Sequence, residues 1–135
     1  MKLLVVGLLL LCVNSLTFAG IHTPHSKTCD EESAKKYMLY REARNQKKNV
    51  QVLVLRVLEN RVKKFKTNTC TELFRKGAYP YMKKGVKQVP PSFTKVYESA
   101  KNSDNFKGSK YFYFNHVPHK FGKNTKKIGG LYFSE

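Results

Sequence analysis

Carboxylates are scarce in this sequence, which has 9 Asp and Glu residues against 26 Lys and Arg residues and a formal net charge of +17. A hydrolase that works with a pair of acids needs two carboxylates brought together, and this shortage argues against one. Nucleophile-elbow, phosphate-loop and paired-carboxylate motifs are also absent. The sequence has no Asn-x-Ser/Thr triplet, so we expect no ordinary N-linked glycan. We therefore predict a protein that is not an enzyme and that uses no cofactor.

Long apolar runs are equally scarce, and the only one stands at the start of the chain. There Lys2 precedes the apolar run 3–12, and small residues lead up to Ala19. These are the charged, apolar and small-residue regions of a secretory signal peptide, so we predict a signal peptide over 1–19 and a single secreted cationic domain over 20–135. No second run is long enough to cross a bilayer, and we expect no integral membrane insertion.

Cysteine is rare too, since only Cys29 and Cys70 lie beyond the predicted signal peptide. In an oxidising compartment the default interpretation is one disulfide, which would tie the start of the mature chain to its middle. On the loop-entropy model such a bond is worth about 3–4 kcal/mol. Two free thiols or an intermolecular pair are the alternatives. The oligomeric state stays open, with a homodimer as one option.

Residues typical of helix starts predict two helices. Asp30 precedes two glutamates, and basic residues follow later, which suits the helix macrodipole and predicts a helix over about 31–46. Ser92 begins a stretch of apolar residues at helical spacing that reaches Ala100, and this predicts another helix. The tail over 116–135 shows no clear period, so we expect it to be irregular.

The stretch that begins at Val50 is ambiguous. Apolar residues at helical spacing continue to Leu73, and neither Gly nor Pro occurs before Lys76, which predicts a long helix over about 50–76. The alternating valines at its start also fit a β-strand over 50–58, which would make the protein α+β. We favour the helix and hence an all-α fold, a small helical bundle with an irregular C-terminal tail.

Basic residues gather in two segments. Between Arg61 and Lys87 a single acid, Glu72, interrupts them, and 105–134 holds lysines without any acid. Because self-repulsion destabilises a compact state, this surplus predicts a cationic surface that meets an anionic partner, with a merely solvated face as the alternative. The predicted basic surface consists of Arg61, Lys63, Lys64, Lys66, Arg75, Lys76, Lys83, Lys84, Lys87, Lys120, Lys123, Lys126 and Lys127.

An aromatic run and a histidine pair lie near the C-terminus. The predicted aromatic patch consists of Tyr111, Phe112, Tyr113 and Phe114. Such a run is more often core, although an exposed version would offer stacking beside lysines. His116 and His119 fit a metal pair or an acid–base pair on paper, but no third metal ligand is evident. Exposed loop positions are the simpler interpretation, so we predict no metal site and no catalytic residue.

Several short segments carry a family resemblance over about residues 50–119. They are Val50-Gln51 at the start of the long helix, Leu58-Glu59-Asn60-Arg61 with basic residues after it, Pro90-Pro91, the Tyr97 region, and Tyr111-Phe112-Tyr113 followed by Val117-Pro118. In these the chain resembles the sperm lysins and related acrosomal proteins of marine gastropods. The resemblance implies a small, secreted, very basic helical bundle that binds and opens the egg envelope stoichiometrically, without cutting it.

Together these features predict a secreted, non-enzymatic binding protein whose partner is an acidic extracellular glycoprotein coat or another polyanion. The resemblance adds storage in a secretory or acrosomal vesicle and a role in fertilization. The alternative is a salivary, venom or immune effector that binds sulfated glycans or anionic membranes. A nuclease-like enzyme that uses His116 or His119 is a third interpretation. Binding to any polyanion should weaken steeply as the salt concentration rises.

Overall fold

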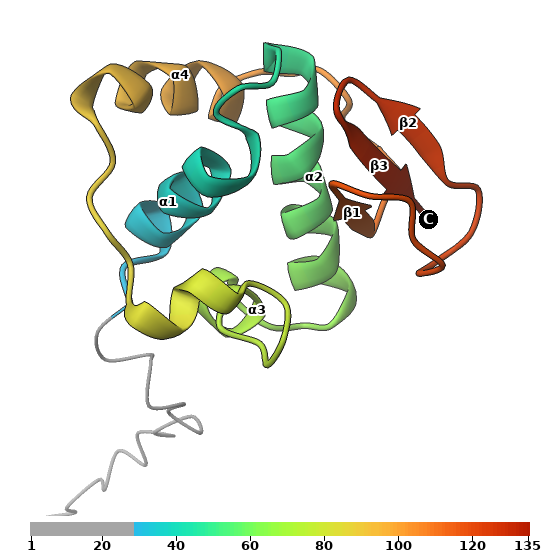
Figure 1. Ribbon diagram of the computed structural model, residues 1–135, viewed down its shortest axis with the longest axis horizontal. Coiled ribbons are helices and arrows are strands. Elements are labelled where there is room, and N and C mark those ends of the chain that lie inside the picture. Colours follow the sequence, from blue (N-terminus) through green and yellow to red (C-terminus); the bar gives the residue numbers. More distant parts are fainter. Residues whose placement is uncertain (1–28) are drawn as a thin grey trace, which may run out of the picture.

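The computed structural model describes residues 29–135, so the predicted signal peptide lies outside the described residues. The elements are the helices α1 (Glu31–Ala43), α2 (Lys48–Lys64), α3 (Thr69–Leu73) and α4 (Pro91–Lys101), the short 3-10 helix η1 (Pro80–Lys84), and the strands β1 (Tyr113–Asn115), β2 (Lys126–Ile128) and β3 (Leu131–Ser134). Figure 1 shows α2 in the middle, with α1 and α4 on one side and the sheet on the other. Helix α2 contacts α1, α3, α4 and β1, so it is the element around which the others pack.

Helix α1 confirms the helix predicted near the start of the mature chain. The side chain of Asp30 accepts a hydrogen bond from the backbone N–H of Ser33, and Glu31 lies in the first turn. This cap and the early negative charge satisfy the free N–H groups of the helix start. Helix α4 is also confirmed, but it begins at Pro91 instead of after Ser92. Proline fits the first helical position because its missing N–H would have had no partner there.

Helix α2 confirms the favoured interpretation of the ambiguous stretch, and the β-strand predicted as its alternative over 50–58 is wrong. Apart from Arg56, every residue of that stretch is buried. A helix enclosed on all sides is apolar all round, so its alternating valines do not indicate a strand.

The prediction that this helix continues to residue 76 is wrong. Helix α2 ends with Phe65 as its C-cap, and Lys66 follows at a φ of +50°. That left-handed backbone cannot continue an α-helix. Asn68 then caps α3 by accepting a hydrogen bond from the N–H of Thr71 at 2.8 Å. Two short-range caps thus replace the Gly or Pro that sequence reasoning expects at a break.

The all-α prediction is right only in its coarser part, because the chain is mostly helical but its predicted irregular tail forms a sheet. Strand β3 lies between β1 and β2 and pairs antiparallel with both, with Phe114 opposite Phe133. Gly129 turns the chain between β2 and β3 at a φ of +60°, and a Cβ there would lie 2.6 Å from Cγ2 of Val50. Glycine is therefore needed where the hairpin meets the start of α2.

Buried side chains from every helix and from β3 form one core. Its largest fully buried members are Met38, Leu39, Leu53, Leu58, Leu73, Met82, Tyr97, Leu131 and Phe133. Each such apolar side chain contributes about 1.5–3 kcal/mol of hydrophobic stabilisation relative to exposure. The predicted disulfide between Cys29 and Cys70 is confirmed and joins the start of α1 to α3. Among residues 29–135, none of the helices has the length and apolar character that crossing a membrane requires.

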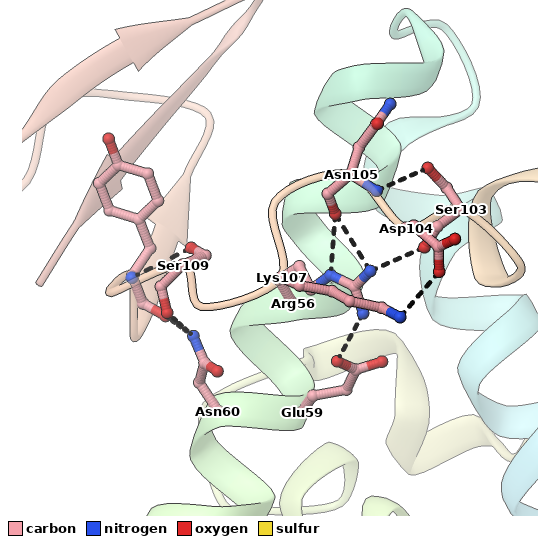
Figure 2. Close-up of polar contacts among 9 residues, drawn as sticks. Arg56, Glu59, Asn60, Ser103, Asp104, Asn105, Lys107 and Ser109 are labelled. Atoms are coloured by element: carbon pink, nitrogen blue, oxygen red, sulfur yellow. Dashed lines mark hydrogen bonds and ion pairs between the residues drawn. The ribbon is translucent and has the colours of Figure 1, made fainter.

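Two polar side chains of α2 fix the segment that leads from α4 to β1 (Figure 2). Arg56 donates to the carbonyl oxygens of Ser103 at 2.8 Å and Asn105 at 3.0 Å. One turn further along α2, Asn60 donates to the carbonyl oxygen of Ser109 at 2.8 Å. Backbone carbonyls of an irregular segment need such partners when they leave bulk water. The hydrogen bonds of Arg56 and Asn60 therefore determine where the chain enters β1, and with it the position of the aromatic run.

Candidate functional site

Most of the predicted basic surface is exposed and lacks an acidic partner. Its lysines are all exposed, and within residues 29–135 none of them forms an ion pair. Arg75 is also exposed, but its Nε lies 3.3 Å from a carboxylate oxygen of Glu72. These lysines are Lys63, Lys64, Lys66, Lys76, Lys83, Lys84, Lys87, Lys120, Lys123, Lys126 and Lys127.

The exposed cations lie mainly where helices and the hairpin end. One group lies in the last turn of α2 and just after it, over 63–66, and a second follows α3 over 75–76. Since α2 and α3 pack together at one end of the molecule (Figure 1), both groups belong to that end. The third group lies at the end of η1 and after it, over 83–87, and the fourth lies in and before β2 over 120–127. Positive charge beyond a helix C-terminus is favoured by the macrodipole, so the fold tolerates the first group well.

Arg61 does not belong to this surface, which corrects the prediction. Its side chain is buried, and its Nε contacts the carboxylate of the equally buried Glu72. It also donates from NH1 to the carbonyl oxygen of Phe112 at 3.1 Å, so it links α2 to α3 and to the start of β1. Its guanidinium carbon lies 5.1 Å from the ring centre of Phe65 and 5.2 Å from that of Tyr113. The lone acid in a basic segment was the sequence signal for this pairing.

The predicted aromatic patch is half-buried and divides between the core and the surface. Tyr111 and Phe114 pack against buried Phe133, with ring centres 5.6 and 6.3 Å apart. Tyr113 instead stacks on Phe121, which is 64% exposed. The remaining member, Phe112, lies under the ammonium group of Lys64, whose Nζ is 4.4 Å from the ring centre. Of the predicted aromatic patch, therefore, only Tyr113, stacked on Phe121, and Phe112 lie next to the basic surface.

Two hollows flank the guanidinium of Arg61. We call the first the polar hollow, a space of about 300 Å³ whose lining includes Glu42, Tyr79, Tyr113, Asn115, His116 and Phe121. We call the second the apolar hollow, a space of about 410 Å³ lined by Phe65, Thr67, Thr71 and Phe74, with Glu72 at its base. Arg61 and Arg75 line both.

Glu42 and His116, which line the polar hollow, take part in a set of linked hydrogen bonds. One oxygen of Glu42 lies 2.6 Å from Nε2 of His116, and the other accepts from the hydroxyl of Tyr81 at 2.7 Å. Burial, and then the charge of Glu42, raise the pKa values of Tyr79 and Tyr81 well above their ordinary range. Both tyrosines therefore stay neutral, and both oxygens of Glu42 are engaged by Tyr81 and His116. These hydrogen bonds hold the loop after β1 against α1.

The two histidines singled out in the sequence act separately. His116 contacts Glu42, while Nε2 of His119 lies 3.4 Å from the carbonyl oxygen of Tyr132 on β3. General acid–base catalysis needs both groups at one reacting bond, and these contacts direct them to different elements. In the described part of the chain no three His, Cys, Asp or Glu side chains gather as metal ligands would.

Sequence reasoning missed Phe65 and Phe121 as surface residues. Phe65 is 50% exposed, although it belongs to the run of apolar residues at helical spacing that predicts a longer helix. It leaves the core because α2 ends there, and its position between Lys64 and Lys66 was the available signal. Phe121 stands in the loop before β2, where no period indicated a direction.

Comparisons of this chain with protein-family models, with curated proteins and with solved structures find no match. The resemblance to gastropod sperm lysins therefore stays a prediction. The site is described by its own chemistry: exposed lysines that form no ion pair within residues 29–135, an internal Arg61–Glu72 pair, and two hollows beside partly exposed aromatic rings.

Proposed function

We propose that this protein is a secreted, non-enzymatic cationic protein that binds an acidic extracellular glycoprotein coat. The observation that carries the proposal is the set of exposed lysines without a carboxylate partner among residues 29–135. The fold does not need these charges for its own ion pairs, and their mutual repulsion opposes compaction. A negatively charged partner relieves that repulsion and releases its own counterions.

Two further features support a coat as the partner. The disulfide between Cys29 and Cys70 suits an extracellular compartment. The lysines at the end of α2, the lysine after α3 and those before and in β2 belong to separate elements, so one molecule can engage several acidic groups at once. Such a protein opens a coat by competing for the contacts between its fibres, one molecule for each contact displaced. In the form implied by the resemblance, the coat is an egg envelope.

Binding is tested with an immobilised sialylated glycoprotein, its desialylated form as matched control, and rising sodium chloride. We expect the logarithm of the association constant to fall linearly with the logarithm of the salt concentration, and the desialylated form to bind far more weakly. Heparin and vesicles with anionic lipids serve as competitors. Equal affinity for the two glycoprotein forms would contradict the proposal, and much tighter binding to heparin or to vesicles would favour the alternative partners.

Coat opening is tested by adding graded amounts of the protein to isolated egg envelopes while light scattering is recorded. The proposal predicts clearing in proportion to the protein added, with no new fragments of the envelope polypeptides. Continued clearing at trace amounts would mean turnover and therefore an enzyme.

A further inference from the structure

The apolar hollow lies at the α2–α3 end of the molecule, near the exposed basic residues of segments 63–66 and 75–76. Two phenylalanines, Phe65 and Phe74, and two threonines line it between the end of α2 and α3. Its volume of about 410 Å³ lies near the lower end of the range for ligand pockets, so it suits a side chain better than a large ligand. Phe65 is 50% exposed, so one wall of the hollow remains open to an incoming partner.

Several contacts hold the lining of this hollow in place. Buried Arg61 and Glu72 contact each other there, and the guanidinium of Arg61 packs against the ring of Phe65 at 5.1 Å. The disulfide at Cys70 fixes α3 to the start of α1. A pocket that is already formed loses little conformational entropy when a ligand enters, which raises its affinity.

Arg75 lines the hollow and brings an exposed positive charge to it, and three lysines are sequence neighbours of its lining residues. Arg75 directs its Nε toward Glu72 at 3.3 Å, which leaves its NH1 and NH2 groups for a second carboxylate. Lys64 and Lys66 flank Phe65 in the chain, and Lys76 follows Arg75. These three lysines are exposed and form no ion pair within the described chain. Charge complementarity therefore calls for carboxylates around whatever apolar group enters.

We infer that the apolar hollow is an anchor pocket for one apolar side chain of an acidic polypeptide, whose flanking carboxylates meet Arg75 and the neighbouring lysines. This inference rests on the proposed function and assigns to its partner a peptide motif, an aromatic or large aliphatic residue between acids. A sulfated glycan has no large apolar group to bury in a concave site, and a bilayer projects no side chain into one. A buried anchor inside a charged rim is the usual arrangement of protein–peptide interfaces.

The test uses two labelled acidic peptides that differ only at a central Phe or Ser, titrated by fluorescence anisotropy against the full mature protein. The wild-type protein should bind the Phe peptide about tenfold more tightly, as expected for partial burial of one aromatic side chain. Phe65→Ala should abolish this preference while it leaves the affinity for the Ser peptide unchanged. Phe106→Ala is the matched control, because Phe106 is also exposed but lies in the loop after α4, and it should keep the preference.

A second variant, Thr71→Leu, fills the hollow from α3 and should also remove the preference, which guards against misfolding of Phe65→Ala. Equal affinity of the wild-type protein for both peptides, each sensitive to salt, would overturn the anchor pocket and leave polyanion binding intact. A preference that survives both variants would place the anchor elsewhere and overturn the inference too. No salt-sensitive binding to either peptide, to the sialylated glycoprotein or to heparin would overturn both proposals.

Discussion

The α1–α4 side and the α2–α3 end of the molecule use charge in opposite ways. On the first side, Glu32 of α1 accepts hydrogen bonds from the Tyr97 hydroxyl at 2.7 Å and from the Lys101 ammonium at 2.9 Å, both on α4. Partial burial opposes ionisation, but these bonds prevail and lower the pKa of Glu32 to about 2. At the other end the acid, Glu72, is buried against Arg61, and the lysines around it have no carboxylate partner within the described residues.

The difference separates the charges that build the fold from those that are free to bind. The few acids join elements: Glu32 joins α1 to α4, Glu42 joins α1 to the loop after β1, and Glu72 joins α3 to α2. Within residues 29–135 the lysines of the basic surface form no ion pair with a carboxylate, although Lys64 and Lys127 lie over the rings of Phe112 and Tyr132. Changes at the acids and their partners should therefore alter stability, while changes at the lysines should alter affinity for a polyanion.

The largest effect on stability is expected at the buried Arg61–Glu72 pair of the α2–α3 end. Arg61→Met leaves Glu72 buried without its main partner and should lower the free energy of unfolding by about 3–5 kcal/mol. Arg75→Met is the matched control, because Arg75 faces the same carboxylate from a side chain that is 49% exposed, and it should cost about 1 kcal/mol or less. Urea unfolding measures both. Equal losses would mean that burial of the pair is unimportant.

The covalent connection between the two regions comes next. Replacing both Cys29 and Cys70 with Ser should lower the free energy of unfolding by about 3 kcal/mol, because the bond restricts the unfolded chain. The wild-type protein unfolded with and without a reductant is the control and should show the same difference. If the double variant unfolds at the wild-type urea concentration, the bond contributes nothing to stability.

A smaller effect is expected at the contact between α1 and α4. Tyr97→Phe removes the hydroxyl that donates to Glu32 and should cost about 1 kcal/mol. Tyr132→Phe is the control, since the described chain shows no hydrogen bond for that hydroxyl, and it should leave stability unchanged. Thermal unfolding followed by circular dichroism compares them. Similar melting temperatures for the two variants would argue against the α1–α4 contact.

The smallest effect is the acid dependence of the same contact. The pKa of Glu32 in the folded protein, about 2, lies below its ordinary value of 4.5, so its contribution is complete above pH 4.5 and is lost as the pH falls toward 2. Glu32→Gln should flatten the fall of the urea midpoint across that window. Glu98→Gln on α4 should keep the wild-type slope. Parallel curves for Glu32→Gln and the wild-type protein would contradict the assignment.

How far the sequence predicts this fold depends on the length of the signal. Asp30 and the glutamates after it predict α1 correctly, and the presence of only two cysteines beyond the signal peptide predicts the disulfide. Strands of three or four residues are too short for a period to appear, so the sheet over 113–134 was missed. The end of α2 was missed because a left-handed Lys66 makes the break without Gly or Pro.

The site was predictable in its charge but not in its shape. The number of basic residues and their segments can be taken from the sequence, and the lysines of the predicted basic surface are exposed. The sequence does not show which basic side chain is buried. Arg61 of α2 is buried because it pairs with Glu72, which lies on the separate helix α3. The apolar hollow likewise needs Phe65 and Phe74 on neighbouring helices at a definite separation, which only the packing of α3 on α2 supplies.

The most direct test of the division between folding charges and binding charges compares two triple variants of equal net charge. One replaces Lys63, Lys64 and Lys66 at the end of α2 with Gln, and the other replaces Lys95, Lys101 and Lys107 on α4 and in the loop after it. The account predicts that the first loses at least about tenfold in affinity for the sialylated glycoprotein. Its free energy of unfolding should stay within about 0.5 kcal/mol of the wild-type value. The second should keep most of its affinity and lose some stability. Equal loss of affinity in both would show that only total charge matters and would contradict the account.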